Sequence, residues 1–262
     1  MALLEMIGLG GDKQAVILDI GEAYTKIGFA GESVPRHIIP SRVQRLIGSE
    51  LVETKVVKYD ANEDELFDIL REFLHSIYFK YLLVNPKERR VVISESLLAP
   101  VKFRNTLAKI LFQYFDVVSV MFAPGHLFAL FTLGVSSALV VDCGYNETLV
   151  VPIYEHTPIL AAVESFQIAG RAIHGILQEE LLKSTGLDIK EDLIENIKVT
   201  SCFVGSYGKP SDYTAQTIEY PMGDGTMIKI DGKIRANSFS AMFDDDEEEK
   251  SITTTILSAI AR

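Results

Sequence analysis

The stretch Asp19–Gly31, DIGEAYTKIGFAG, decides the fold of this 262-residue chain. The apolar run Ala15–Leu18 that precedes it is too short for a helix and predicts a buried strand. Gly21 then supplies a turn without a side chain, and Tyr24–Phe29 restart an extended segment. The stretch therefore predicts a β-hairpin with an acid at the end of its first strand and a lysine, Lys26, in its second.

Such a hairpin offers the groups that bind a phosphate and its cation. Its backbone N–H groups can surround an anion, and Lys26 adds a compact positive charge. Asp19 can hold the water shell of Mg²⁺, which keeps several waters and takes one or two carboxylates. An ordinary glycine-containing hairpin explains the same pattern, because short glycine motifs often match by accident.

A second copy of the pattern lies in Ser136–Ile153, SSALVVDCGYNETLVVPI. An apolar strand again ends in an acid, Asp142, and Gly144 comes two residues later. A second apolar strand, Thr148–Ile153, comes after the turn. Two D-x-G hairpins more than a hundred residues apart predict a duplicated domain with a cleft between the copies.

The residues around both hairpins resemble actin and the actin-related proteins. Asp19–Ser41, DIGEAYTKIGFAGESVPRHIIPS, is similar to the family's first phosphate hairpin. Pro152–Glu155 (PIYE) and Ala169–Arg171 (AGR) resemble the family's second hairpin and the segment after it, and Asn196–Val204 (NIKVTSCFV) resembles a later helix-to-strand passage. Leu82–Ser96, LLVNPKERRVVISES, looks most like the divergent actin-related proteins at the pointed end of dynactin.

The resemblance implies an α/β chain with the two-lobed actin fold. We expect a flexible N-terminal arm over residues 1–13, a first lobe over 14–135 and a second lobe over 136–262. Actins carry a large filament-contact subdomain where this chain has only residues 41–62, so that subdomain is expected to be largely missing. The second lobe is expected to be truncated, as in a fragment or a short isoform.

The resemblance also implies ATP or ADP with Mg²⁺ as a structural ligand. Asp19 and Asp142 match the acids beside the Mg²⁺ water shell, and Lys26 matches the phosphate-binding cation. The backbone around Gly21 and Gly144 matches the phosphate cradle. The residues themselves predict no metal-binding cluster.

Several positions depart from the family pattern. They are Glu22 and Ala23 in the first turn, Tyr145 and Asn146 in the second, Gly125 in place of a glutamine that orients water, and Leu149 in place of a nearby histidine. Glu22 brings a like charge toward a polyphosphate, at a cost of roughly 1–4 kcal/mol near 4 Å. Without the glutamine and the histidine nothing positions an attacking water. We therefore expect that the protein has no catalytic residue and is not an enzyme.

The expected loss of the filament-contact subdomain predicts a function for this chain. Actin-type contacts are head-to-tail and propagate until something stops them. By resemblance, the chain is a non-catalytic subunit that caps the pointed end of dynactin's short actin-like filament in the cytoplasmic cytoskeleton and supports dynein-driven transport. Its partners would be the filament subunits and the other pointed-end proteins. The alternatives are a nucleotide-hydrolysing actin-like ATPase and a nuclear actin-related subunit of a chromatin remodeller.

Composition narrows the partners. The net charge is −11, and six consecutive acids, Asp244–Glu249, are expected to form a solvated loop. No basic patch predicts binding to nucleic acid. The N-terminus lacks the pattern of a signal peptide, and no run reaches the ~20 apolar residues of a membrane span.

Cys143 and Cys202 stand in apolar, strand-like runs and are expected to be buried, reduced thiols. The five histidines lack metal-ligand spacing.

Between these landmarks the pattern alternates strands and helices, which favours an α/β class. A capping box of Asn62 and Glu65 predicts a helix that continues to Tyr81. Residues 42–58 show only short, mixed segments, and 205–216 are loop-like. The other predicted elements are a short extended piece at 38–40, strands at 90–94, 117–122 and around Cys202, a hairpin over 218–231, and helices from Pro100, over 124–133, 170–182, 189–197, 236–243 and 251–261.

Overall fold

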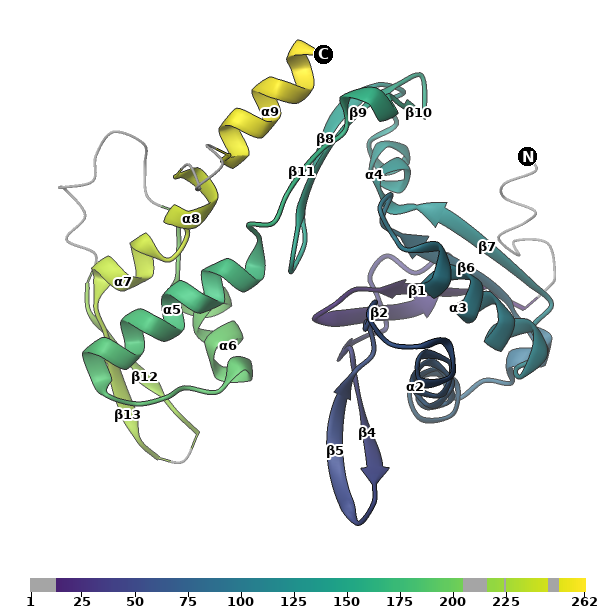
Figure 1. Ribbon diagram of the computed structural model, residues 1–262, viewed down its shortest axis with the longest axis horizontal. Helices are drawn as coiled ribbons and strands as arrows, with labels where there is room; N and C mark the ends of the chain where they lie inside the picture. Colours follow the sequence, from purple (N-terminus) through teal and green to yellow (C-terminus); the bar gives the residue numbers. More distant parts are fainter. Residues whose placement is uncertain (1–12, 205–215, 224, 245–249) are drawn as a thin grey trace. The chain divides into compact units, whose positions relative to one another are not determined.

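The computed structural model describes residues 13–204, 216–223, 225–244 and 250–262 (Figure 1). The chain divides into two compact units that part between Val135 and Ser136. The N-terminal arm, apart from Lys13, most of the predicted loop over 205–216 and most of the acidic run lie outside the described residues. The assignment of the units to the two actin lobes stays a prediction.

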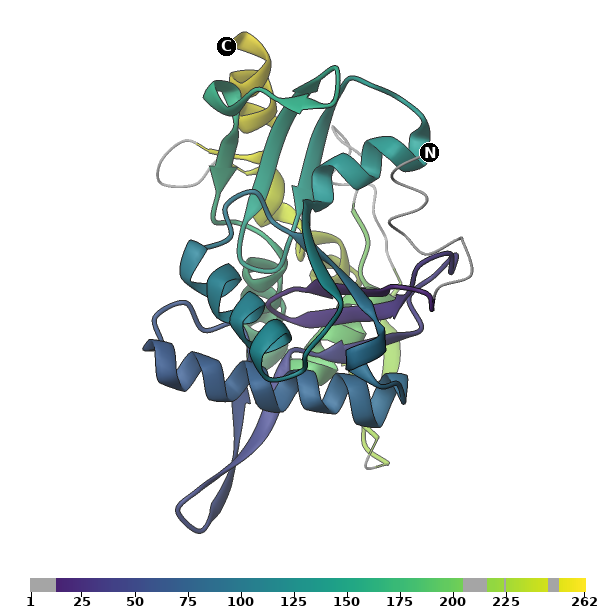
Figure 2. The same cartoon turned by 90° about the vertical axis from the view of Figure 1, so that its right-hand side faces the viewer.

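A five-stranded sheet forms the centre of unit 1 (Figure 2). Its neighbours, in order, are β3 (His37–Pro40), β2 (Tyr24–Phe29), β1 (Val16–Ile20), β6 (Arg90–Glu95) and β7 (Ser119–Pro124). The pairs β3–β2 and β2–β1 are antiparallel, whereas β1–β6 and β6–β7 are parallel. The predicted first hairpin is therefore β1–β2, and a parallel neighbour lies on the other side of β1.

Helices cover both faces of this sheet. They are α2 (Glu63–Ser76), which continues into the π-helix η1 (Ile77–Leu82), α3 (Val101–Gln113) and α4 (Gly125–Leu133), with a short 3-10 turn η2 (Pro86–Glu88) before β6. Val16 and Leu18 join the main core with α2 and α3. Ala15 lies on the opposite face in a smaller cluster with Phe128 of α4. Successive side chains of a strand point to opposite faces, so Val16 and Leu18 join one cluster while Ala15 and Ile17 join the other.

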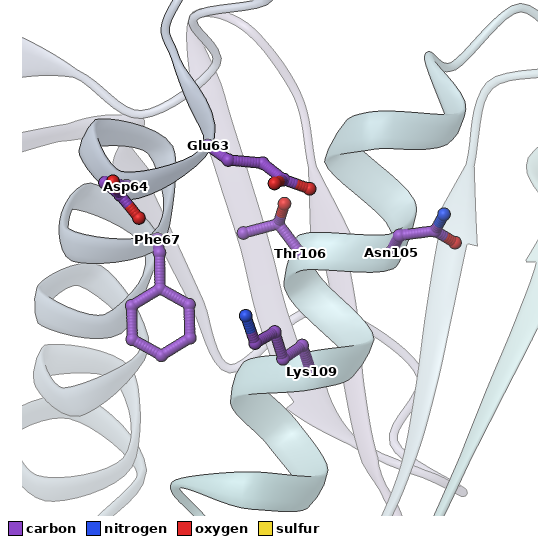
Figure 3. Close-up of a pocket in the computed structure, with 6 residues that line it drawn as sticks. All are labelled: Glu63, Asp64, Phe67, Asn105, Thr106 and Lys109. Atoms are coloured by element: carbon purple, nitrogen blue, oxygen red, sulfur yellow. The ribbon is translucent and has the colours of Figure 1, made fainter.

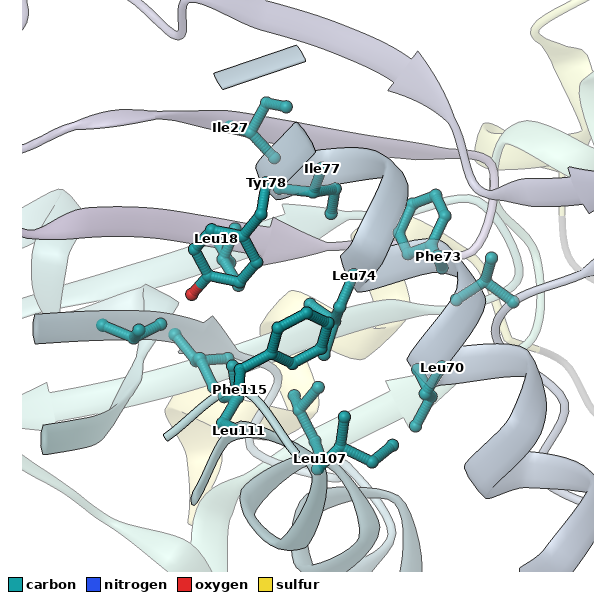
Figure 4. Packing of buried hydrophobic residues seen from close by; sticks show 14 of the residues in the cluster. Leu18, Ile27, Leu70, Phe73, Leu74, Ile77, Tyr78, Leu107, Leu111 and Phe115 are labelled. Atoms are coloured by element: carbon teal, nitrogen blue, oxygen red, sulfur yellow. The ribbon is translucent and has the colours of Figure 1, made fainter. Parts of the chain in front are cut away.

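The main core of unit 1 consists mostly of aliphatic side chains, with a few aromatic rings packed among them (Figure 4). Phe73 and Tyr78 are almost fully buried, and the rings of Tyr78 and Phe115 lie 5.2 Å apart. The Tyr78 hydroxyl has no hydrogen-bond partner among the described residues. Burial therefore raises the pKa of Tyr78 well above its ordinary value.

The start of α2 confirms half of the predicted capping box. The Asn62 side chain accepts from the Glu65 amide at 2.8 Å, whereas the Glu65 carboxylate bonds Lys58 Nζ at 2.8 Å. The predicted end of the helical segment near Tyr81 is confirmed, but the α-helix changes to a π-helix at Ile77 and ends at Leu82. The buried residues Ile77 and Tyr78 stay in the core through this change of winding.

A two-stranded antiparallel hairpin fills most of the interval between β3 and α2 (Figure 1). It consists of β4 (Arg42–Ile47) and β5 (Glu50–Lys55), where the sequence predicted only mixed segments. Arg45 ties it to α2 through Glu72 at 3.3 Å and Asp68 at 3.9 Å. The whole stretch from Ser41 to Asn62 therefore holds one ordered hairpin and a short connection.

Unit 2 contains an antiparallel sheet centred on β9. Its strands are β8 (Ala138–Cys143), β9 (Thr148–Tyr154), β10 (Thr157–Pro158) and β11 (Glu164–Phe166), with a 3-10 turn η3 (Leu160–Ala162). Both β10 and β11 pair with one side of β9, and β8 pairs with the other. The last helix, α9 (Ile252–Ala261), packs on β9 and β11. The second predicted hairpin is therefore β8–β9.

The rest of unit 2 has its own apolar core. It is formed by α5 (Gly170–Thr185), α6 (Glu191–Ser201), β12 (Ile218–Pro221), β13 (Met227–Ile230), α7 (Gly232–Asn237) and α8 (Ser240–Phe243). The predicted hairpin over 218–231 is confirmed as β12–β13. In the part of the chain that the structure describes, no helix combines the length and apolarity needed to cross a bilayer.

Three element predictions need correction. Cys202 ends α6, with its amide on the Lys198 carbonyl at 3.3 Å, and is not in a strand. The helix predicted over 236–243 is two helices, because the Asp231 side chain caps an earlier start and Phe239 interrupts the winding. The strand predicted at 117–122 begins at Ser119, because Asp116 takes a left-handed turn with φ 53°.

Candidate functional site

The first hairpin places all three of its predicted site residues together. Asp19 lies opposite Lys26 in the β1–β2 register, and their side chains form an ion pair of 3.0 Å that is about half exposed. The Gly21 amide donates to the Tyr24 carbonyl at 3.2 Å. A Cβ at Gly21 would lie 2.8 Å from that oxygen, so the turn requires glycine.

A small buried network holds this turn in place. The Ser41 hydroxyl lies 2.6 Å from the Gly21 carbonyl oxygen and 2.8 Å from Thr25 Oγ1, and the Ser41 amide donates to the Ala23 carbonyl at 2.9 Å. Both Ser41 and Thr25 are fully buried. This role of Ser41 was not predicted from the sequence. The signal was Pro40 before it, which ends a strand next to the turn.

The second hairpin repeats the turn of the first. The Gly144 amide donates to the Glu147 carbonyl at 2.9 Å, and a Cβ at Gly144 would lie 3.0 Å from that oxygen. In each hairpin, therefore, the glycine two residues after the acid bonds the carbonyl three residues on. The amides of Gly21 and Gly144 close their own turns, so a phosphate would have to bind other N–H groups of the tips.

Helix α5 begins on the carbonyls of the second hairpin. The Gly170 amide donates to the Gly144 carbonyl at 3.1 Å, and the Arg171 amide donates to the Tyr145 carbonyl at 2.8 Å. A Cβ at Gly170 would lie within 3.4–3.6 Å of Gly144 and Tyr145, so glycine allows this close approach. Two amides at the start of α5 are thus satisfied by the hairpin itself.

The side chain of Tyr145 fixes the tip of the second hairpin to α5 and α6. Its hydroxyl donates to Glu191, and its ring lies edge-on to His174 with centroids 5.5 Å apart. His174 Nε2 is 2.6 Å from Glu195, which also accepts from Lys198 Nζ at 2.5 Å. The sequence marks Tyr145 as a departure from the family but does not predict these contacts, because its partners lie in distant helices.

Burial and hydrogen bonds together set the pKa values of this cluster. Burial lowers the pKa of His174, and the neighbouring Lys198 ammonium acts in the same direction. Burial alone would raise the pKa of Glu195, but hydrogen bonds from Lys198 and His174 outweigh it and lower that pKa. The distance of 2.6 Å between His174 Nε2 and the Glu195 carboxylate indicates that Nε2 carries the proton. The buried Nδ1 then has no hydrogen-bond partner in the described part of the chain.

The second hairpin is more acidic than the first. Residue 149, opposite Asp142, is a buried leucine, so this hairpin lacks a lysine at the place of Lys26. Burial raises the pKa of Glu147, and the negative charge of Asp142 raises it further. The side chains here fit a hydrated cation better than a polyphosphate. At the first hairpin, Asp19 and Lys26 fit both a hydrated Mg²⁺ and a phosphate.

Cys143 corrects an expectation. It was predicted to be buried, but it is exposed at the last residue of β8. Cys202 is partly buried, and neither cysteine forms a disulfide. Partial loss of solvent around the sulfur atoms still raises the pKa of both thiols. Within the described ranges no three His, Cys, Asp or Glu side chains are placed to share a metal ion.

A separate groove of about 300 Å³ lies between α2 and α3 (Figure 3). Its lining residues are Glu63, Asp64, Phe67, Asn105, Thr106 and Lys109. The Lys109 ammonium lies 5.6 Å from the centre of the Phe67 ring. None of the residues predicted from the hairpins lines this groove, so it is not the predicted phosphate site.

Comparison with known protein families matches residues 10–220 to the family described as Actin. The chain therefore belongs to the actin family, and its mixed α/β units are a partial actin-like fold.

The individual relatives share 27–28% sequence identity with the chain. The chain is 28% identical over 214 residues to Actin-related protein 10 of Dictyostelium discoideum, covering 73% of this chain and 45% of that protein. It is 27% identical over 245 residues to Actin-like protein 7A of Macaca fascicularis and of Homo sapiens, covering 83% of this chain and 56% of each relative. The chain spans about half the length of the curated relatives it matches.

Proposed function

We propose that this actin family member is a non-catalytic subunit that ends the short actin-like filament of dynactin at its pointed end. In that role it would support dynein-driven transport along microtubules in the cytoplasm. Its partners would be the filament subunits and the other pointed-end proteins. Support for this narrower assignment comes from the resemblance of Leu82–Ser96 to pointed-end actin-related proteins and from the match to an Actin-related protein 10.

The observation that carries the proposal is the single hairpin between β3 and α2. A filament protomer needs two complementary surfaces, because head-to-tail contacts add one subunit after another. Here the interval that holds the family's filament-contact subdomain contains only β4–β5 and a short connection. A subunit that keeps one contact surface and lacks the other joins a filament and stops its growth.

Two positions support a subunit that does not hydrolyse nucleotide. Gly125 takes the place of the water-orienting glutamine, and a Cβ there would lie 2.9 Å from Ser94 Oγ. A longer side chain at residue 125 therefore requires Ser94 to move. Leu149, in the place of the nearby histidine, is buried in β9. Neither residue can orient or activate a water molecule.

Incorporation into dynactin is the first test. A tagged full-length protein should co-purify with the filament and pointed-end subunits, and mixtures with purified filament subunits should show slower addition at the pointed end. A protein that runs free of dynactin would contradict the proposal. As a matched gain-of-function variant, grafting a filament-contact subdomain from a filament-forming actin in place of Arg42–Lys55 should allow further addition.

Phosphate release is the second test. The chain with MgATP, alone and with filament subunits, should release no more phosphate than the filament subunits account for. A variant such as Asp142→Asn should leave that background unchanged. Turnover comparable to that of filament actin, lost in Asp142→Asn, would support an ATPase instead.

A further inference from the structure

We propose that the groove between α2 and α3 is an interaction surface for a helical segment of a partner protein. This segment presents an arginine or lysine to Glu63 and Asp64 and, one helical turn away, an aspartate or glutamate to Lys109. The inference goes beyond the proposed function and does not depend on it, because the groove shares no residue with β4–β5 or with the two D-x-G hairpins.

Two neighbouring helices of unit 1 form the groove (Figure 3). Helices α2 and α3 contact each other, and both bury apolar side chains, such as Leu66 and Leu107, in the main core. Between them the buried Thr106 donates its hydroxyl to the Lys102 carbonyl at 2.9 Å. A volume of about 300 Å³ is at the lower limit for pockets that enclose a whole ligand, so the groove suits one or two side chains of a partner.

Two carboxylates of the groove lack a positive partner. Three of the five acids on α2 form ion pairs within unit 1 (Glu65–Lys58, Asp68–Arg71 and Glu72–Arg45). The other two, Glu63 and Asp64, form no ion pair or side-chain hydrogen bond with a described residue, and both line the groove. Acids in the first turn also stabilise the start of a helix, so their charge alone does not mark a binding site.

An unpaired lysine on α3 lines the same groove. Lys109 forms no ion pair within the described part of the chain, and its ammonium lies 5.6 Å from the centre of the Phe67 ring. This distance is typical of a cation–π contact, and Figure 3 shows the ammonium turned toward the ring. The start of α2 does not require this lysine. The groove therefore presents charges of both signs that do not neutralise each other.

The spacing of these charges indicates what fits between the helices. On α2 the two acids precede Phe67 by three and four residues, and on α3 Asn105 precedes Lys109 by four. Residues with this spacing are neighbours on one side of a helix, about 5–6 Å apart. A partner helix with an arginine and, four residues away, a glutamate carries its charges at the same spacing.

The order of charges also limits the class of partner. The arginine guanidinium has five N–H donors, which is enough to bind both carboxylates of the groove. The glutamate then reaches the Lys109 ammonium beside Phe67. A ligand with charges of one sign would place a like charge at one end, which disfavours nucleic acid and purely acidic or basic tails.

NMR spectra of the full chain test the proposal. The probe is an alanine-based helical peptide of about 16 residues that carries one arginine and, four residues later, one glutamate. Titration should give saturable shifts at the backbone amides of Glu63–Phe67 and Asn105–Lys109. Binding should weaken as NaCl is added, because the contacts join exposed charges.

Neutral variants remove one end of the groove at a time. Both the double variant Glu63→Gln with Asp64→Asn and the single variant Lys109→Met should weaken peptide binding by up to about fivefold, the range of an exposed ion pair. Glu72→Gln removes a negative charge from α2 outside the groove. It is the matched control and should leave binding unchanged.

A charge reversal identifies the pairing. A peptide with a second arginine in place of the glutamate should bind the unmodified chain about fivefold more weakly than the probe. Lys109→Glu should reverse this order of affinities. This exchange stays informative if a neutral variant loses stability, because Lys109 is exposed and the two peptides are compared on one folded chain.

Three results would overturn the proposal: no saturable shifts, shifts only outside α2 and α3, or an unchanged order of affinities in Lys109→Glu. The tagged full-length protein should bind the probe as well. Protection of the groove amides without binding in that protein would also overturn the proposal, because another part of its own chain would then be the occupant. Shifts that depend on chain concentration alone would do the same by indicating a second copy.

Discussion

Strand β1 in unit 1 has hydrogen-bonded neighbours on both sides, whereas its counterpart β8 in unit 2 has a neighbour on one side among the described residues. The turns after the two strands are nearly the same, with a glycine amide bonded to the carbonyl three residues on. Their surroundings differ. Buried hydroxyls and a lysine support the first turn, whereas the start of α5 and Tyr145 hold the second.

This difference shows which properties the D-x-G motif fixes. The motif determines a tight turn through one glycine and one backbone bond. It does not determine the charge, burial or anchoring of the turn, because those come from residues far away in the sequence. Two copies of one motif can therefore have different binding properties.

The largest expected effect comes from the core of unit 1. Phe73→Ala should lower the free energy of unfolding by about 3–5 kcal/mol, because it removes a buried aromatic ring. The cores of the two units share no residue. Hydrogen exchange followed by mass spectrometry should therefore show lost protection in β1, β2 and α2 and unchanged protection in α5 and α6. Phe112→Ala, at a ring that is 48% exposed, is the control. Equal loss in both units would show that they unfold as one.

A smaller loss is expected from the network under the first hairpin. Ser41→Ala leaves the Gly21 carbonyl and Thr25 Oγ1 without their present partner in a buried place. The cost should be about 1–3 kcal/mol, measured by urea unfolding followed by circular dichroism. Ser41→Thr, which keeps the hydroxyl, should recover part of it. No loss in Ser41→Ala would mean that the turn is held by β1–β2 pairing alone.

The sequence predicted most of the fold because the signals were local. Both hairpins are predicted by an apolar run, an acid and a glycine within a few residues, and the Asn62 cap is predicted by one side chain. The β4–β5 hairpin was missed although Gly48 and Ser49 separate its strands, because its residues are mostly polar. The contacts of Ser41 and Tyr145 could not be predicted, because their partners are close only after folding.

Lowering the pH should reduce the free energy of unfolding through His174, by less than the Ser41→Ala substitution does. Burial, with help from Lys198, lowers the pKa of His174 from its ordinary value of 6.5. The folded state therefore binds fewer protons than the unfolded state, so this stabilisation is complete above pH 6.5 and is lost as the pH falls through the lower folded-state pKa.

The groups that face the imidazole are Tyr145, Glu191, Glu195 and Lys198. Urea midpoints between about pH 7.5 and 5 should fall less steeply in His174→Gln than in the unmodified chain. His75→Gln, at an exposed histidine of α2, is the control and should keep the original slope. An unchanged slope in His174→Gln would remove this histidine from the acid response.

Removing a buried hydroxyl that lacks a hydrogen-bond partner should raise the free energy of unfolding, and each unit offers one such hydroxyl. Tyr78 in unit 1 and Thr255 in unit 2 each bury an oxygen that lacks a hydrogen-bond partner in the described ranges. Tyr78→Phe and Thr255→Val should each raise the free energy of unfolding by about 1 kcal/mol, because the cost of desolvating the hydroxyl disappears. Thermal unfolding measures both. A loss of stability in either variant would reveal a partner for that oxygen.

The smallest effect is expected at the ion pair that distinguishes the two hairpins. Lys26 and Asp19 are 54% and 40% exposed, so water and salt screen their attraction. Lys26→Met should therefore lower the free energy of unfolding by less than about 1 kcal/mol. A double-mutant cycle with Asp19→Asn, at low salt and at about 1 M NaCl, isolates the pair from the other contacts of each side chain. The coupling should shrink with salt. If Lys26→Met leaves stability nearly unchanged and yet weakens binding of MgATP by more than tenfold, Lys26 acts on a ligand. If both stay unchanged, the lysine neutralises Asp19 and has no further role.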